Sequence, residues 1–487
     1  MSSAGRLAMI GLDAADLGLI RSAQGMLPNL TRALGDGTLH TIRSPADLLT
    51  GSVWPTFYTA SNPGTHGIYH HLQWDGDRMS LRRLATDWFD CEPFWSELER
   101  RGRRVVAVDV PLMFRDRLTT GVEVVNWGAH DQLGPLACRP RELADEIRRR
   151  FGSHPMGWEI PVEKSREELA GIRDNLVVGA RRKGALVRWL LDSRPWDFFI
   201  AVFGETHRGG HILWPDGPGR ETIPPGALLD VYRAVDEALG EILAAPSLAG
   251  AGRIVFALHG MGPDPSQDHF VPRAMDLVNA RFPGRSSDGK EDAAVRPARG
   301  IVRRLRESVP AAIQNWVAHR VPVGVRDAVV NRAIVAGHDW AHTPGFDLLA
   351  DVHGYLRLNV RGREREGCLA RESDAFPRYV DWVRECFESL TIPGTGDRLV
   401  HSVELASDAF PGPRLDHLPD LIVTWAGHAP VSRVESRLLG PITAAHATGR
   451  SGNHRRDGFC AVSVPGREPP TLTDIRDLSA FASGVVA

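Results

Sequence analysis

Short apolar segments without polar alternation recur along the chain. They cover residues 7–12, 105–108, 198–203, 254–258 and 421–425. A strand with one face in water alternates apolar and polar residues, whereas a strand buried on both faces does not. Helical patterns lie between these segments, over residues 139–151, 165–191 and 228–245. Strands that alternate with helices predict an α/β fold with a mostly parallel central sheet between two helical layers.

The region from Pro263 to Thr343 interrupts this alternation of strands and helices. It contains a polar, glycine-rich segment at 284–292, followed by helical patterns at 299–314 and 326–334. Segments of this kind are typical of loops and insertions that carry function on a rigid scaffold. We therefore expect one domain over residues 1–487, with residues 263–343 as an inserted cap.

Composition excludes several classes of protein. The chain has 487 residues, 43% hydrophobic and 24% charged, which excludes disordered, fibrous and disulfide-scaffold proteins. Lys and Arg (58) nearly balance Asp and Glu (60), and no recognition module occurs, so neither nucleic acid nor an anionic membrane is an expected partner. No apolar run reaches membrane-spanning length. Five scattered cysteines without a C-x-x-C pair, and an N-terminus without a signal-like apolar segment, predict a cytoplasmic location.

Three predicted strands end in residues that bind metals. Asp13 follows the first strand, His207 follows the strand near 200, and His259 follows the strand near 255. In a parallel sheet, ligands collect beyond the carboxyl ends of the strands, so these side chains are expected at one rim. A single His or Asp at such a place is more often an ordinary loop residue. The convergence of three favours a metal site.

Two further patterns suggest chemistry. The segment from Leu48 to Ile68 is rich in hydroxyl and turn residues, where an exposed nucleophile could lie; a hydroxyl needs activation, which a bound divalent metal supplies. The alternative is a helix start, with Thr50 or Ser52 as a plain N-cap. His207 and His211 have the four-residue spacing of many zinc ligands, although the paired glycines between them favour a tight loop over a regular helix. His454 lies in another polar turn.

Together these segments resemble the type I phosphodiesterase/nucleotide pyrophosphatase branch of the alkaline phosphatase superfamily. The motifs include GLDAAD at 11–16, LPNL at 27–30, the stretch from Thr50 through NPGTHGI at 62–68, NVRGRE at 359–364, and the histidines at 207, 211, 259 and 454. They occur in family order across nearly the whole chain. The expected fold is accordingly the alkaline-phosphatase-like three-layer sandwich.

The resemblance implies two divalent metal ions, usually zinc, around a threonine or serine nucleophile that is transiently phosphorylated. Carried over by position, Asp13, Thr50 and His259 would hold one ion, with Thr50 as both ligand and nucleophile. His207, His211 and His454 would hold the other. Two ions about 4 Å apart can stabilise both ends of an in-line displacement, which agrees with this division of roles.

Two positions depart from the family pattern. The family has Asp where this chain has His207, and an Asp-His pair where it has Leu258 and His259. Leucine cannot bind a metal, so the first site loses an anionic ligand. We expect one of three outcomes: a weaker or different metal there, a substitute from Asp264, Asp268 or His269, or a single ion in the site of three histidines.

The sequence thus predicts a metal-dependent hydrolase of small phosphoester substrates that acts through a covalent intermediate on Thr50. The alternatives are a non-hydrolytic or single-metal biosynthetic enzyme on the same fold, a sulfate or phosphonate ester hydrolase, and a binding protein without catalysis. His338, Asp339 and His342 are candidate substrate-binding residues, with a solvated loop as the alternative. Arg361 and Arg363 are expected to stabilise a turn. The oligomeric state stays open.

Overall fold

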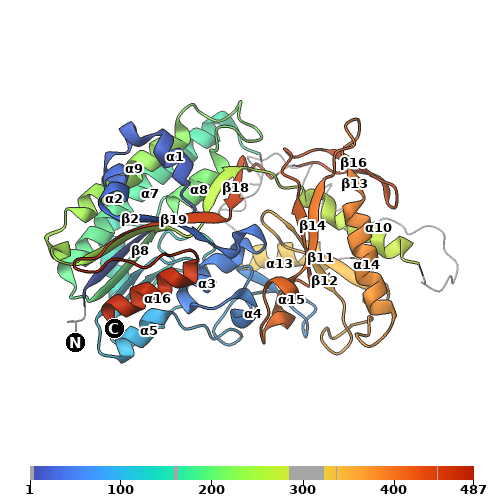
Figure 1. Cartoon of the computed structure of the whole chain (residues 1–487), viewed down its shortest axis with the longest axis horizontal. Coiled ribbons are helices and arrows are strands. Elements are labelled where there is room, and N and C mark those ends of the chain that lie inside the picture. Colours follow the sequence, from blue (N-terminus) through green and yellow to red (C-terminus); the bar gives the residue numbers. More distant parts are fainter. Residues whose placement is uncertain (1–4, 158–162, 284–322, 336, 447) are drawn as a thin grey trace.

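An eight-stranded sheet forms the centre of the larger lobe (Figure 1). The structure is a computed structural model that describes residues 5–157, 163–283, 323–335, 337–446 and 448–487. The strands, in spatial order, are β2 (Thr38–Arg43), β19 (Asp457–Ser463), β9 (Gly252–Ala257), β1 (Leu7–Leu12), β8 (Phe198–Phe203), β5 (Val105–Val108), β6 (Val122–Val125) and β7 (Ala137–Arg139). The five strands from β9 to β6 are parallel, while β19 and β7 run antiparallel to their neighbours.

Helices cover both faces of this sheet (Figure 1). Alternate residues of β1 point to opposite faces, so Ala8 and Ile10 join one hydrophobic cluster and Leu7 and Met9 join the other. The first face carries α1 (Leu17–Ser22), α2 (Pro28–Asp36), α6 (Leu143–Phe151), α7 (Arg166–Ser193), α8 (Glu205–Ile212) and α9 (Ala227–Leu243). The second carries α3 (Val53–Thr59), α4 (Pro63–His66), α5 (Phe94–Arg100) and α16 (Ile475–Val486). The predicted α/β class with a mostly parallel sheet is confirmed.

A second lobe is built on an antiparallel sheet in the order β11 (Gly345–Leu348), β12 (Gly354–Leu358), β15 (Leu421–Trp425) and β14 (Val400–Leu405). Helices α10 (Val271–Arg281) and α14 (Ala375–Glu388) share its main hydrophobic cluster. The other elements of this part of the chain are α13 (Val323–Val335), α15 (Ala406–Ala409), β13 (Leu390–Thr391), β16 (Arg433–Ser436) and β17 (Gly440–Thr443). The segment 421–425, expected in the main parallel sheet, is therefore β15 of a separate antiparallel sheet.

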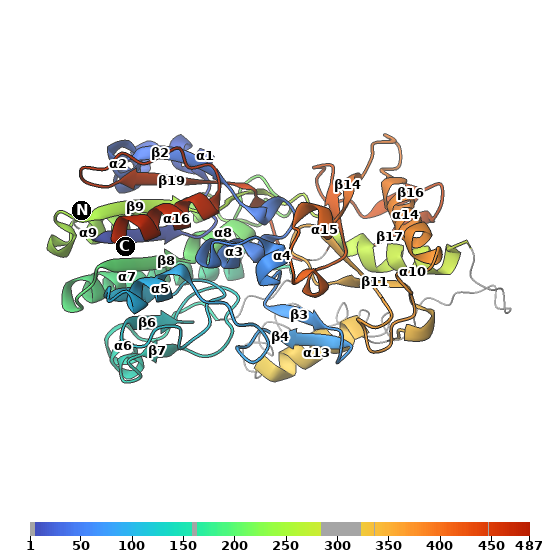
Figure 2. The same ribbon diagram turned by 60° about the horizontal axis from the view of Figure 1, so that its bottom comes forward.

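Early residues also belong to the second lobe. The hairpin of β3 (Leu72–Asp75) and β4 (Ser80–Arg83) packs beside α13 (Figure 2) and contributes Trp74 to a hydrophobic cluster with Trp340 and Phe346. The segment predicted as a cap, 263–343, supplies α10 and α13, whereas its polar segment at 284–292 and the helical pattern at 299–314 lie outside the described residues. The cap boundaries stay a prediction.

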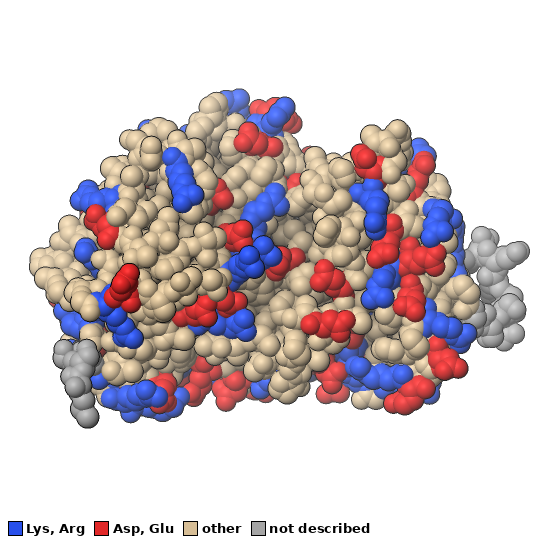
Figure 3. Space-filling model, viewed as in Figure 1, with Lys and Arg blue, Asp and Glu red and all other residues tan. Residues whose placement is uncertain are grey.

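The remaining elements connect the two lobes. Strands β10 (Gly260–Pro263) and β18 (Gly452–Arg455) form an antiparallel pair, which lies next to α8. On the face shown in Figure 3, basic and acidic side chains intermix over both lobes, as the near balance of 58 and 60 charges implies. Within the described ranges, none of the helices combines the length and apolar character that crossing a membrane requires. All five cysteines are unpaired.

Candidate metal centre

Asp13 extends β1 by one residue at the carboxyl edge of the sheet. Its backbone amide still donates to the carbonyl of Phe203 at 2.9 Å, and its side chain is completely buried. Trp54 Nε1 donates to Asp13 Oδ1 at 2.8 Å. The other carboxylate oxygen, Oδ2, lies 2.7 Å from His130 Nδ1 and 3.1 Å from His207 Nδ1. One oxygen is thus fixed by the protein, and the other faces two imidazoles.

His207 and His211 lie one turn apart on α8, which begins directly after β8. The expected tight loop is wrong: the glycines between the two histidines are helical. A Cβ at Gly210 would lie 2.8 Å from the Met261 side chain, and one at Gly209 would lie 3.2 Å from Leu228. The glycines let this buried helix pack closely against its neighbours, and that packing outweighs their low helix propensity.

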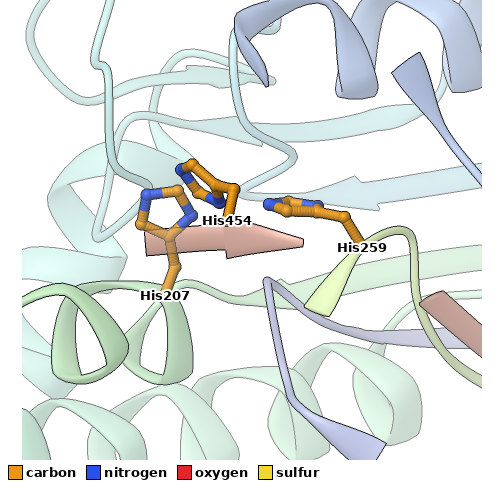
Figure 4. A group of neighbouring side chains, drawn as sticks. All are labelled: His207, His259 and His454. Atoms are coloured by element: carbon orange, nitrogen blue, oxygen red, sulfur yellow. The ribbon is translucent and has the colours of Figure 1, made fainter. Parts of the chain in front are cut away.

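Three histidine rings converge from different elements (Figure 4). His259 follows β9, and His454 lies on β18 directly opposite Met261 of β10. The ring centroid of His454 is 4.8 Å from that of His207 and 4.7 Å from that of His259. One nitrogen from each of the three rings lies within 4.8 Å of the other two. The structure therefore brings together Asp13, His207, His211, His259 and His454, as the topology predicted.

His130 was not predicted from the sequence, yet it belongs to this cluster. It lies in the loop after β6, and its ring stacks on His207 with centroids 3.6 Å apart. Asp13, His130 and His207 form a second group whose possible ligand atoms all lie within 4.8 Å of one another. Like Asp13, His130 follows the carboxyl end of a parallel strand, where ligands collect. The apolar pattern of β6 is weak in the sequence because Glu123 interrupts it.

Burial and neighbouring charges set the protonation of the cluster. Burial raises the pKa of Asp13, but His130 and His207 outweigh it and hold that pKa well below its usual range. Burial lowers the pKa of His259 to about 3, and burial together with His211 keeps the pKa of His454 well below its ordinary value. Burial opposes a charge on His130, but Asp13 and Asp131 raise its pKa. The cluster therefore combines an ionised carboxylate at Asp13 with neutral imidazoles at His259 and His454, a donor set that suits a divalent ion such as zinc.

The inward-facing atoms of this cluster fit a bound metal. Both ring nitrogens of His259 and Nδ1 of His454 are buried and form no hydrogen bond within the described part of the chain. Asp13 Oδ2 and the Nδ1 atoms of His130 and His207 are in ion-pair contact, without hydrogen-bond geometry. Buried polar atoms in proteins are nearly always satisfied, so a group of buried polar atoms without hydrogen bonds needs an explanation. A coordinated cation provides one.

Thr50 lies at the start of a 3-10 turn, Thr50–Ser52, that leads into α3. Its side chain is 7% exposed, and Oγ1 donates to Asp351 Oδ2 at 3.3 Å. Ser52 occupies the N-cap position of α3, as the alternative expected, but its side chain makes no capping hydrogen bond and donates instead to the Ile68 carbonyl at 2.6 Å. Thr50 is not at an N-cap position, because the N-cap of its 3-10 turn is Leu49. Trp54, one turn further on, links this segment to Asp13. The backbone at Gly51 approaches Tyr69 so closely that a Cβ would lie 2.1 Å from its carbonyl oxygen, so only glycine fits there.

Asp351 and Arg450 are further residues that the sequence did not identify. Asp351 lies between β11 and β12 of the second lobe, and Arg450 Nη2 donates to its Oδ1 at 3.2 Å. Burial raises the pKa of Asp351, but Arg450 and His70 outweigh it and lower that pKa. The positive charge of Arg450 also helps to lower the pKa values of His211 and His454. The second lobe thus contributes an ionised carboxylate beside Thr50.

The proposed substitutes for the missing ligand take part in other contacts. Asp264 Oδ1 accepts from Asn453 at 3.0 Å, and Asp268 Oδ1 accepts from Ser266 Oγ at 3.0 Å. His269 Nε2 lies 2.8 Å from the carbonyl oxygen of Val431. None of the three belongs to the two metal-binding groups found among the described residues. Leu258 is buried in the hydrophobic cluster that contains Trp54 and Phe256.

The predicted substrate-binding residues lie on η6 (Trp340–His342) and just before it. His342 Nδ1 is 2.8 Å from Asp339 Oδ2, and their side chains are 61% and 73% exposed. The ring of His338 stacks on Trp340. Their role in substrate binding stays a prediction. Arg363 pairs with Asp420, 57 positions away in sequence, through two hydrogen bonds of 2.7 Å. It also donates to the nearby Leu358 carbonyl at 2.6 Å, which agrees with the expected role in stabilising a turn.

A buried ion pair supports the loop that carries His130. Lys183 of α7 and Asp109 are both fully buried and in direct contact, and Lys183 Nζ also donates to the carbonyl of Val202 at 3.2 Å. Asp109 accepts from the backbone amides of Trp127 at 2.8 Å and Gly128 at 2.7 Å. The pair therefore fixes the backbone two residues before His130.

We expect Lys183→Met to reduce the free energy of unfolding by about 3 to 5 kcal/mol, because it leaves a buried carboxylate without its counter-charge. Chemical denaturation measures this change. The control is Arg181→Met on the same helix, where a surface ion pair with Glu237 should contribute no more than about 1 kcal/mol. Equal stabilities of the two variants would contradict the expectation.

Comparison with known proteins agrees with this geometry. The site lies at the carboxyl edge of a mostly parallel sheet, in an alkaline-phosphatase-like fold. The sequence profile of the type I phosphodiesterase / nucleotide pyrophosphatase family matches residues 7–396. The chain therefore belongs to that family, as the order of its motifs predicted. His454 lies beyond the matched residues, but the fold brings it to the site. A search of curated protein sequences finds no match.

Solved structures share the fold at low sequence identity. Phosphonoacetate hydrolase from Sinorhizobium meliloti 1021, in complex with phosphonoformate, is 15% identical with a TM-score of 0.54, over 99% of this chain and 96% of that one. Murine ectonucleotide pyrophosphatase / phosphodiesterase 5 is 11% identical with a TM-score of 0.51, over 99% and 95% of the two chains. The human form is 10% identical with a TM-score of 0.51, over 99% and 94%.

Proposed function

We propose that this protein is a metal-dependent hydrolase of small phosphoester substrates that acts through a covalent intermediate on Thr50. Membership in the type I phosphodiesterase / nucleotide pyrophosphatase family supports a phosphoester as the bond that is hydrolysed. The observation that carries the proposal is the group of buried Asp and His side chains at one sheet edge, where the ring nitrogens of His259 and Nδ1 of His454 make no hydrogen bond. A hydrogen bond from Trp54 connects Asp13 of this group to the segment of Thr50. Zinc is the ion we propose, because imidazoles with one carboxylate are its usual ligands.

The residues around Thr50 suggest how the reaction proceeds. Thr50 Oγ1 attacks phosphorus, the new O–P bond forms, and the bond to the leaving alcohol or phenol oxygen breaks. Asp351, which accepts the hydrogen bond from Oγ1, orients the hydroxyl and is positioned to take its proton. The leaving oxygen takes up a proton from solvent. Water then attacks the phosphothreonine, the bond between phosphorus and Thr50 Oγ1 breaks, and Oγ1 regains a proton as the phosphate product leaves. A divalent ion held by Asp13, His207 and the neighbouring histidines would stabilise negative charge on the phosphoryl oxygens and would favour the ionised nucleophile.

Arg450 supplies positive charge to the same region. Its guanidinium pairs with Asp351, and its charge acts on His211 and His454. Asp351 thus lies between the Thr50 hydroxyl and the Arg450 guanidinium. Such preorganised charges favour an anionic substrate and stabilise the charge that develops during phosphoryl transfer.

The test combines elemental analysis with four nitrophenyl esters: a phosphate monoester, a phosphate diester, a phosphonate monoester and a sulfate. We expect turnover of at least one phosphate ester, loss of turnover after chelation and recovery with added zinc. The ester that reacts fastest would define the substrate class. Turnover confined to the sulfate, turnover that survives complete metal removal, or no turnover of any ester by the zinc-loaded protein would overturn the proposal.

A further inference from the structure

One buried hydroxyl of the second lobe has no hydrogen-bond partner. Tyr355 lies on β12, one residue after the strand begins, and is 1% exposed. Its hydroxyl oxygen makes no hydrogen bond among the described residues. Burying a hydroxyl without a partner costs free energy, which a phenylalanine at the same position would avoid. The stability of the fold therefore does not explain this hydroxyl, whereas a role in the chemistry of the site would.

Packing places this hydroxyl beside the candidate nucleophile. The ring of Tyr355 meets that of Tyr69 edge-on, with centroids 5.9 Å apart, and the backbone carbonyl of Tyr69 lies against Gly51. Leu49 belongs to the same hydrophobic cluster as both tyrosines. The residues before and after Thr50 are thus held against this part of the second lobe. The phenol oxygen of Tyr355 faces the backbone and the side chain of Thr50, without hydrogen-bond geometry.

Two residues of the second lobe therefore face the Thr50 hydroxyl, and they offer different chemistry. Asp351 accepts the hydrogen of Thr50 Oγ1 at 3.3 Å, which suits the step in which this hydroxyl loses its proton. Tyr355 offers the opposite, because a phenol hydroxyl can donate a hydrogen bond. Once Oγ1 is bonded to phosphorus it has no hydrogen and can only accept. A donor beside Oγ1 suits the step in which the bond to phosphorus breaks and negative charge returns to this oxygen.

We propose that Tyr355 is a further catalytic residue, which donates a hydrogen bond to Thr50 Oγ1 while the phosphothreonine is hydrolysed. This inference rests on the proposed function and deepens it by assigning a donor for the second step. In that step water adds to phosphorus, the bond between phosphorus and Oγ1 breaks, and Oγ1 leaves with the electron pair. The O–H bond of Tyr355 stays intact. Oγ1 takes its final proton from solvent, to which the attacking water loses one.

The test is the kinetics of zinc-loaded Tyr355→Phe with the nitrophenyl phosphate ester that the wild type hydrolyses fastest. We expect kcat to fall about 100-fold, the usual effect of removing one donor to a developing oxyanion. The ratio kcat/KM covers only the steps up to formation of the phosphothreonine, so it should stay within about threefold of wild type. Mass spectrometry of samples quenched in acid during turnover should find a larger phosphorylated fraction at Thr50 in the variant.

Thermal denaturation separates this role from a structural one. Because the Tyr355 hydroxyl makes no hydrogen bond in the folded chain, Tyr355→Phe should have a Tm at least as high as that of the wild type. Tyr58→Phe is the matched control. Tyr58 is also buried, but its hydroxyl donates to the Leu112 carbonyl at 3.2 Å, so this variant should have a lower Tm and normal kcat.

The outcomes distinguish this inference from the proposed function. Wild-type kcat in Tyr355→Phe, a fall in kcat/KM as large as the fall in kcat, or a Tm as low as that of Tyr58→Phe would overturn the role of Tyr355 and leave the hydrolase proposal intact. Turnover by the wild type without any phosphothreonine at position 50 would overturn the covalent mechanism, and the role of Tyr355 with it.

Discussion

Thr50→Ala is expected to lower kcat for phosphoester hydrolysis by at least about 10³-fold, a loss of about 4 kcal/mol of transition-state stabilisation. The substitution removes the proposed nucleophile and no metal ligand of the Asp13 and His207 cluster, so zinc content and folding should be nearly those of the wild type. Steady-state kinetics measure the loss. Mass spectrometry of wild-type protein quenched in acid should detect a phosphorylated peptide that contains Thr50 and is missing from the variant.

Two controls make this result specific to the hydroxyl at position 50. Thr59 lies on α3, where its Oγ1 donates to the Pro55 carbonyl at 2.6 Å, and Thr59→Ala should keep normal turnover. Thr50→Ser retains a hydroxyl and should keep measurable turnover and the phosphopeptide. Wild-type kcat in Thr50→Ala, at normal zinc content, would exclude the covalent mechanism.

The central fold could be predicted because its signals are local. Strands β1, β5 and β8 coincide with the apolar segments at 7–12, 105–108 and 198–203. A strand buried on both faces must be apolar throughout, and that requirement is visible within a few residues. The positions of Asp13 and His259 follow from the same pattern, since parallel strands deliver their carboxyl ends to one edge.

The remaining features depend on contacts between distant segments. His130 becomes a candidate ligand only when the chain reversal after β6 brings its ring onto His207. Asp351 comes from the second lobe, 301 positions away from Thr50 in sequence, and nothing local marks it as a partner of that hydroxyl. The helical conformation of Gly209 and Gly210 likewise reflects packing against Leu228 and Met261. Tertiary packing outweighs local propensity at each of these places.

Asp13→Asn is expected to abolish zinc binding at micromolar concentration and to lower kcat by at least about 10³-fold. Asp13 is the only carboxylate in the two metal-binding groups found among the described residues. Asparagine can still accept from Trp54 through its oxygen, so the fold should persist. It would present an uncharged amide to His130 and His207, and the site would lose the negative charge that offsets a divalent ion.

Thermal denaturation with and without zinc separates a loss of zinc binding from a loss of stability in the metal-free protein. A ligand at 100 times its Kd stabilises the native state by about 2.7 kcal/mol, so the wild type should gain that amount and Asp13→Asn should gain nothing. Asp16→Asn is the matched control: Asp16 is close in sequence and caps α1 through the Leu19 amide at 2.7 Å, outside the cluster. It should lose no more than about 1 kcal/mol of stability and respond to zinc like the wild type. If zinc raised the Tm of Asp13→Asn as much as that of the wild type, the ion would be bound elsewhere, and the cluster around His207 would have to be explained by packing alone.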